Sequence, residues 1–225
     1  MSSISVAGDV SGAISIAAPS AAGSGVLTLP TGTDTLVGKA TTDTLTNKTL
    51  VAPALGTPAS GVLTNCTGVP AAALPAGSVL QVVNSQTGAV ATGTTTIPRD
   101  NTIPQITEGT QFLSLAITPI SATSKLLIQV NMFLSPSLIA YATAALFQDA
   151  TANALAVSTA IAPAANGVAI TSFNYFMTSG TTSSTTFTVR AGMQTAGTIT
   201  VNGDNSTRTF GGVASTSITI TEIAA

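Results

Sequence analysis

Carboxylates are the side chains of this sequence with the clearest chemical use, because it contains no histidine and only one cysteine. Without histidine, neither a Ser-His-Asp triad nor a histidine-based metal site can form. Two carboxyl groups held about 5 to 9.5 Å apart are the usual machinery for cleaving glycans. Asp100 and Glu108 are the nearest such pair in the second half of the chain, but no aromatic residue that could stack on a sugar accompanies them. We interpret the pair as a loop contact and expect no enzymatic activity.

A metal site here would have to use oxygen ligands, which points to Ca²⁺ or Mg²⁺. The run Asn202-Gly203-Asp204-Asn205 offers some of these oxygens but not the rest of a calcium loop. A hairpin turn with Asn and Gly at positive φ is the simpler interpretation. We therefore expect no metal and no cofactor, and we interpret the lone Cys66 as a small buried apolar side chain.

The charge and the hydropathy of the chain indicate whether it binds nucleic acid or inserts into a membrane. The 225 residues include six Lys or Arg and eight Asp or Glu, which is 6% of the chain, against about 25% in an ordinary soluble domain. Six scattered basic residues and a net charge of −2 predict no binding to nucleic acid. The mean hydropathy is +0.51, but the uncharged stretch 126–148 begins with the alternation of a strand. We therefore expect no membrane insertion. No basic residue precedes Lys39, so we also expect no cleaved leader.

The aromatic residues divide the chain into two halves. All nine lie after residue 111. Aromatic side chains dominate core energetics, so the first half is too poor in bulky groups to close a core alone. Its Leu and Val residues form short clusters separated by Thr, Gly, Pro and Ser, and each cluster needs neighbouring chains to cover it. We favour a shaft of three intertwined chains over the alternative, a disordered low-complexity linker.

The sequence pattern of the second half is typical of an all-β domain. Alternating segments are separated by turn residues such as Asn166-Gly167, Ser179-Gly180 and Gly211-Gly212. This pattern predicts a β-sandwich or jelly roll. The predicted strands are 79–84, 112–118, 125–134, 139–148, 168–178, 185–194, 198–201 and 215–223, with a further turn at Ser135-Pro136-Ser137.

Within these segments, alternation predicts which side chains face the core. Phe187, Val189 and Ala191 share one side of their strand, and Ile218, Ile220 and Glu222 share one side of the last strand. Placing Glu222 with the apolar set raises the question of its partner. Arg190 or Arg208 could reach it across a subunit interface, but the default interpretation of both is a surface arginine that serves only solubility.

Several segments resemble a known family. The stretches GVLTLPTGTDTLV (25–37), TDTLTNKTL (42–50) and GTPASGVL (56–63) resemble the shaft repeats of tailed-bacteriophage fibre proteins. The stretches SKLLIQV (124–130), TFTVR (186–190) and ASTSITITEI (214–223) resemble the trimeric jelly-roll heads of phage fibres, which share an architecture with complement-type and tumour-necrosis-factor-type domains.

The resemblance implies a homotrimer located on the virion and made in the bacterial host cytoplasm. It implies an N-terminal anchor to another virion protein at residues 1–24, an intertwined fibre shaft at 25–76 and a β-sandwich head at 77–225. The expected function is that of a tail fibre whose head attaches to the host cell surface, through a glycan or an outer-membrane protein. The alternative is a capsid fibre, or a decoration protein that braces the tail, without receptor binding.

Turn residues of the head are the candidate receptor contacts. They lie in the loops around 135–137, 162–167, 179–184 and 202–205. The residues selected are Ser135, Ser137, Asn166, Ser179, Asn202 and Asp204.

Overall fold

The computed structural model describes residues 3–7, 13–17 and 74–225, and the chain divides into two units, Met1–Val62 and Leu63–Ala225. In the first unit, β1 (Ser3–Ala7) and β2 (Ala13–Ala17) form an antiparallel hairpin within the predicted anchor. The predicted shaft up to residue 73, including Cys66, lies outside the described residues. The second unit contains the predicted head.

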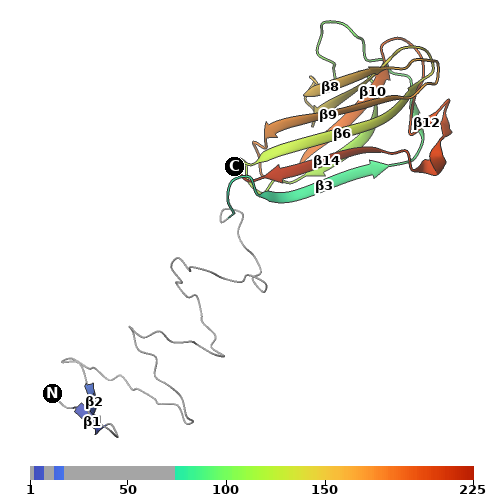
Figure 1. Ribbon diagram of the computed structural model, residues 1–225. Helices are drawn as coiled ribbons and strands as arrows, with labels where there is room; N and C mark the ends of the chain where they lie inside the picture. Colours follow the sequence, from blue (N-terminus) through green and yellow to red (C-terminus); the bar gives the residue numbers. More distant parts are fainter. Residues whose placement is uncertain (1–2, 8–12, 18–73) are drawn as a thin grey trace. The chain divides into compact units, whose positions relative to one another are not determined.

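The head is built from β-strands and one short 3₁₀ turn, η2 (Phe210–Gly212) (Figure 1). In chain order the strands are β3 (Val79–Thr87), β4 (Ala91–Gly93), β5 (Thr110–Ile117), β6 (Lys125–Pro136), β7 (Tyr141–Gln148), β8 (Ala156–Ile161), β9 (Ala169–Thr178), β10 (Thr185–Met193), β11 (Ile199–Val201), β12 (Gly203–Asp204), β13 (Thr207–Arg208) and β14 (Thr216–Ile223).

The main strands pair in a nested order. The first pairs with the last, so β3 lies beside β14, β5 beside β10, β6 beside β9, and β7 beside β8, all antiparallel. Further pairings of β14 with β6 and of β10 with β7 join these ribbons into two sheets, β3-β14-β6-β9 and β5-β10-β7-β8, and the short strands β11 and β4 extend the first of them beyond the end of β6. A long ribbon wound in this way is a jelly roll. The all-β prediction for this half is confirmed.

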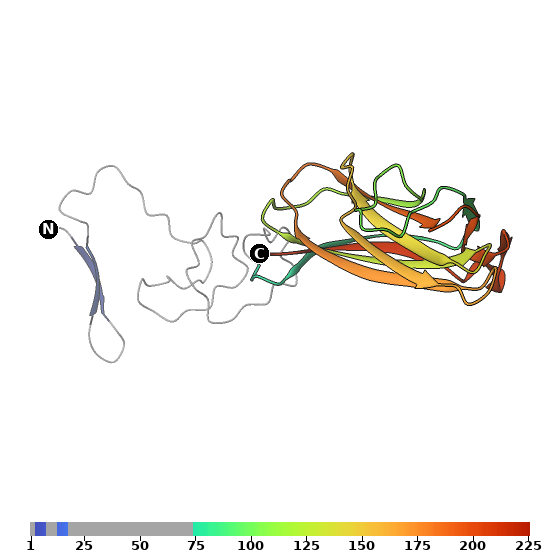
Figure 2. The same cartoon turned by 90° about the horizontal axis from the view of Figure 1, so that it is seen from above.

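The core lies between the two sheets, which form the two layers seen in Figure 2. Each strand contributes alternate side chains, as the pleat requires. Val130 and Ile220 from the larger sheet and Phe187 from the smaller one belong to one buried cluster. The predicted inward sets on β10 and β14 are confirmed, because Phe187, Val189 and Ala191 and also Ile218, Ile220 and Glu222 are buried.

Two predictions about the strands are wrong. Strand β8 was missed, because its sequence AVSTAI has small or apolar residues on both sides and so lacks the polar alternation that marks a half-buried strand. The predicted turn at Ser135-Pro136-Ser137 starts too early. β6 continues through Pro136 and pairs there with β11, so only Ser137 lies beyond the strand. A proline is tolerated as the final strand residue because few ladder bonds remain to be made.

The middle of the outer face of the smaller sheet is covered by the chain itself. The segment 94–109 crosses β7 and β10, and Ile97 packs with Ala145 and Phe147 in a second small core. This segment is anchored by Arg190, which donates hydrogen bonds of 2.9 Å to the carbonyl oxygens of Glu108 and Gly109. The segment therefore covers the middle of this face, whereas its two edges stay exposed at Ser114 on β5 and at Val157 and Ile161 on β8.

Replacing Arg190 with alanine should loosen this covering segment. Two charge-assisted hydrogen bonds are lost, so the local opening free energy should fall by about 1–3 kcal/mol. The measurement is amide hydrogen exchange at Ile97 and Gly109, whose N–H groups bond to Met193 and Thr96. Arg208→Ala, at an exposed arginine, is the control. Equal exchange rates in the two variants would contradict the anchoring role.

Candidate functional site

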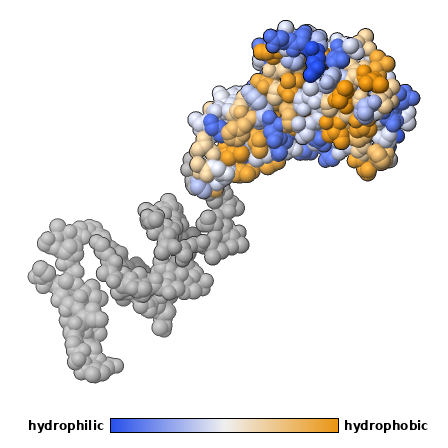
Figure 3. Space-filling view, turned by 45° about the horizontal axis from the view of Figure 1, so that its top comes forward, coloured by the Kyte–Doolittle hydropathy of each residue, from blue (hydrophilic) through white to orange (hydrophobic). Residues whose placement is uncertain are grey.

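The outer face of the larger sheet is a broad surface that the described residues of the chain leave uncovered. Side chains on it form rows that run across β3, β14, β6 and β9. An apolar row contains Val82, Thr221, Leu127 and Phe176. Two amide and hydroxyl rows follow: Asn84, Thr219, Gln129 and Asn174, then Gln86, Ser217, Asn131 and Ser172. Figure 3 shows apolar patches set among polar surface on the head.

Several properties of this face suit protein contact. Val82, Ile170 and Phe176 are each more than half exposed. A groove of about 220 Å³ lies in the amide rows, lined by residues that include Gln129, Asn131 and Asn174. Within the described residues, the side chains of these three make no hydrogen bond, so their donors and acceptors are free for a partner. Lys125 is the one charged residue that faces outward on these four strands.

The head has two chemically different ends. The chain enters and leaves at the base end, where Gly77 N–H donates to the Ala224 carbonyl and Ala224 N–H donates to the Ser78 carbonyl. Figures 1 and 2 show the C-terminus at this end. The loops 118–124, 149–155 and 179–184 also lie at the base end, while 137–140, 162–168 and 202–215 lie at the opposite, tip end.

Glu222 is the central polar residue of the base end. Its side chain is fully buried, and its carboxylate accepts hydrogen bonds from Ser124 Oγ at 2.6 Å, from the Ile120 N–H at 2.9 Å and from the Ser121 N–H at 3.2 Å. Gln81 Nε2 donates a further bond. Burial alone raises the pKa of Glu222, but these donors lower it by more, and the pKa lies below its ordinary value.

Within the described residues of one chain, no arginine pairs with Glu222, and a contact from another subunit stays a prediction. Arg190 is committed to the carbonyl oxygens of the covering segment, and the donors to Glu222 are the neutral groups of its own chain. Such groups satisfy a buried carboxylate when enough of them converge.

Asp100 and Glu108, the carboxylates first considered for catalysis, accept hydrogen bonds from residues of their own loops. Asp100 accepts bonds from the N–H and the hydroxyl of Thr102, which lower its pKa, and Glu108 accepts one from the Gln105 N–H. Local side-chain-to-backbone bonds of this kind stabilise turns.

Three of the four loops predicted to contact a receptor come together at the tip end. They are those around 135–137, 162–167 and 202–205, whereas 179–184 lies at the base end. The individual residues fit contact less well. Ser135, Ser179 and Asn202 are buried, and Ser137, Asn166 and Asp204 are half-buried.

Two of the buried three form hydrogen bonds inside the fold, whereas the Ser135 hydroxyl is buried without a hydrogen-bond partner among the described residues. Ser179 Oγ donates to the Ser121 carbonyl at 2.6 Å, and Asn202 Nδ2 donates to the carbonyls of Thr87 and Ala89. Small polar residues are typical of loops, but they also satisfy buried backbone groups, and residue type alone does not separate these uses. Ser135, Ser179 and Asn202 are therefore withdrawn as surface contacts.

The run Asn202–Asn205 leads into the expected hairpin, shifted along the chain. β12 pairs with β13, and the turn residues are Asn205 and Ser206, both at positive φ. Two positive φ values in a two-residue hairpin loop are the mark of a type I′ turn.

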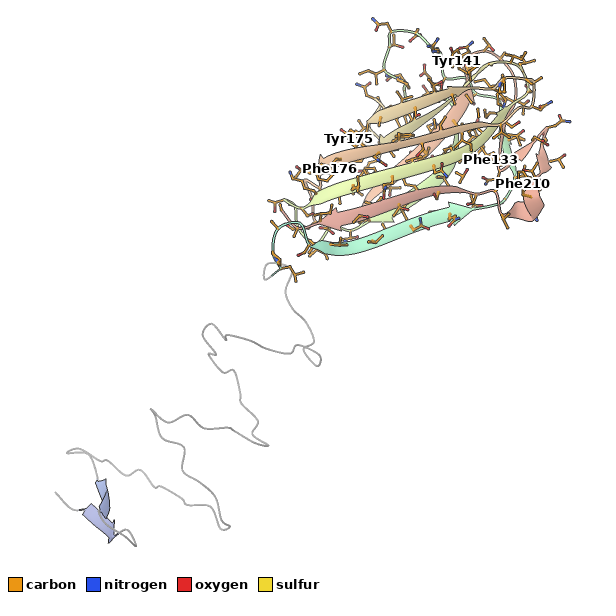
Figure 4. The ribbon with its side chains drawn as sticks, viewed as in Figure 1. Phe133, Tyr141, Tyr175, Phe176 and Phe210 are labelled. Carbon is orange, nitrogen blue, oxygen red and sulfur yellow. The ribbon has the colours of Figure 1, made fainter. Side chains whose placement is uncertain are left out.

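The most exposed large apolar side chains were missed by the sequence analysis. Val213 is 83% exposed, Phe210 74% and Ile139 68%, and all three belong to tip-end loops. Figure 4 shows Phe210 at the end of the head opposite the C-terminus. The available signal was an aromatic residue directly before two glycines, which we interpreted only as a turn.

Comparison with known proteins gives distant similarities. No protein-family model matches the chain, and no curated protein matches it. Similar solved structures include the infectious bursal disease virus VP2 subviral particle, with 12% identity over 66% of this chain and 39% of that chain and a TM-score of 0.27. The tailspike protein 4 enzymatically active domain of bacteriophage CBA120 has 16% identity over 53% of this chain and 18% of that chain, with a TM-score of 0.24.

The chain thus spans well under half the length of either protein. At these identities and TM-scores, neither similarity assigns a function. No helix long and apolar enough to cross a bilayer occurs among the described residues.

Proposed function

We propose that this chain is a fibre protein on the virion of a tailed bacteriophage, that it acts as a homotrimer, and that its head attaches the virion to the bacterial surface. The observation that carries the proposal is the polarity of the head. Its chain connections are gathered at the base end, and its most exposed apolar side chains are gathered at the tip end. A head joined to the virion through its base would present its tip outward.

The uncovered sheet face supplies the surface for assembly. The segment 94–109 packs on the middle of the outer face of the smaller sheet, whereas the larger sheet carries exposed apolar and amide side chains across its outer face, and in this proposal a second copy packs there. Three heads joined in this way would present three tips together and convert weak single contacts into avidity. In this proposal residues 25–76 are the shaft, and the N-terminal segment binds another virion protein.

Deleting the head, residues 77–225, from the protein on virions tests the attachment function. Adsorption to host cells should be lost while particles still assemble. Unchanged adsorption would overturn receptor binding and favour a structural role on the capsid or tail. Imaging of the whole particle would show from which part of the virion the fibre emerges.

The proposed trimer should be insensitive to salt. Assembly through apolar and amide side chains leaves few charges for salt to screen, even at about 1 M NaCl, where the Debye length is about 3 Å. Sedimentation of the full-length protein in low and high salt is the measurement. Dissociation on adding NaCl would show that ion pairs hold the copies together.

A further inference from the structure

The segment 208–213, here called the tip segment, combines exposure with backbone strain. Phe210 has a φ of 49°, in the left-handed region that bulky residues avoid. The sequence supplies glycine at the next two positive-φ positions, Gly211 and Gly212, but not at residue 210. A left-handed conformation is unfavourable for a bulky residue because its Cβ crowds the following carbonyl oxygen.

Packing inside the head does not offset this strain. The Phe210 side chain is 74% exposed, and Val213, three residues later, is 83% exposed. A strained residue that gains no core contact is a recognised indication of function. The strain instead fixes the direction in which the ring is presented.

The tip segment is held in place by its surroundings. Gly88 lies so close to the Gly212 carbonyl that a Cβ would not fit there. Gly212 N–H bonds to the Thr209 carbonyl and Val213 N–H to the Phe210 carbonyl. The segment is therefore a preorganised projection, and ordering it on binding costs little.

The chemistry of the projection favours a protein partner. The two residues after Phe210 are glycines, which add no polar side chain to the exposed ring, and Val213 adds a second exposed apolar side chain. A projecting aromatic side chain beside an arginine is the usual anchor of a protein interface. Arg208, exposed and beside Gly212, is the charged residue of the segment and is complementary to carboxylates.

We propose that the tip segment inserts Phe210 and Val213 into an apolar pocket, rimmed by carboxylates, on a protein of the bacterial surface. This inference rests on the proposed attachment function and names the residues and the class of partner. It also explains why a residue unfavourable for folding occupies position 210.

Phe210→Asn separates binding from folding, because asparagine tolerates the left-handed region. The thermal midpoint of this variant should rise or stay unchanged, while its affinity for cells of the host bacterium should fall about tenfold or more. Ile103→Asn is the matched control. It removes a 54%-exposed apolar side chain from the covering segment and should leave binding unchanged.

The nature of the partner is tested with the full-length protein on treated cells. Protease treatment of the cells should abolish binding, periodate oxidation of their glycans should not, and vesicles of extracted host lipids should not bind. Loss of binding with periodate alone, or binding to the vesicles, would overturn the inference of a protein partner.

Different results would contradict the attachment function and the role of the tip segment. If the unsubstituted protein binds cells and Phe210→Asn binds equally well, the tip inference is wrong and attachment stands. If the unsubstituted protein binds no cells, attachment itself is wrong, and the tip inference falls with it.

Discussion

Glu222→Ala is expected to lower the free energy of unfolding by about 2–4 kcal/mol at neutral pH, because it strands several buried donors at once. The carboxylate joins the last strand to Gln81 on β3 and to the loop residues Ile120, Ser121 and Ser124. Those N–H and hydroxyl groups would lose their acceptor inside the protein. Chemical denaturation at fixed protein concentration is the measurement, since the stability of an oligomer depends on concentration.

The stability that Glu222 contributes should be lost in acid. The pKa of Glu222 is lowered by folding, so its contribution to stability is complete above the ordinary pKa of about 4.3 and is lost as the pH falls through the lowered value. The difference between the unsubstituted protein and Glu222→Gln should therefore be large at neutral pH and shrink in acid. The pKa of Asp100 is also lowered, but Asp100 is present in both proteins, so its contribution to the pH dependence of stability cancels in the difference. A difference that does not change with pH would contradict the ionised network.

Gln129→Arg is expected to weaken the association of the three chains. Residue 129 lies in the middle of the amide rows, between Thr219 and Asn174, so each copy would bring an unpaired charge into the interface. Burying such a charge costs about 2–5 kcal/mol, which corresponds to at least a 30-fold weaker association. Sedimentation equilibrium of the full-length variant measures this change.

The matched control places the same charge on the other sheet. Ser114 is exposed on β5, and Ser114→Arg should leave the assembly intact. Both variants should keep the β-sheet circular dichroism of the unsubstituted protein, because both positions face outward. If Gln129→Arg assembles as well as the control, the larger sheet is not the interface.

Much of the head could be predicted because alternation follows directly from the strand pleat. On β14, the repeated change between Thr or Ser and Ile placed the buried side correctly, including the acidic Glu222. The same rule failed for β8, where Ala, Val and Ile occur on both sides. β8 also has one side toward the core and one toward solvent, but its exposed side carries Val157 and Ile161, so residue type does not mark the division.

The candidate site could be predicted only in outline. Turn chemistry located three loops that meet at one end, but it could not separate Asn202, which bonds to two backbone carbonyls, from a surface residue. It also missed Phe210, because the backbone angle that exposes its ring depends on how 202–215 folds against Gly88. Contacts between segments distant in sequence decide both cases.

The mass of the full-length protein in solution tests the central claim most directly. Sedimentation equilibrium or light scattering on the purified chain should give three times the 22.1-kDa chain mass, in low and in high salt. A protein that stays at the mass of one chain at every concentration would contradict the assembly, and with it the role proposed for the uncovered sheet.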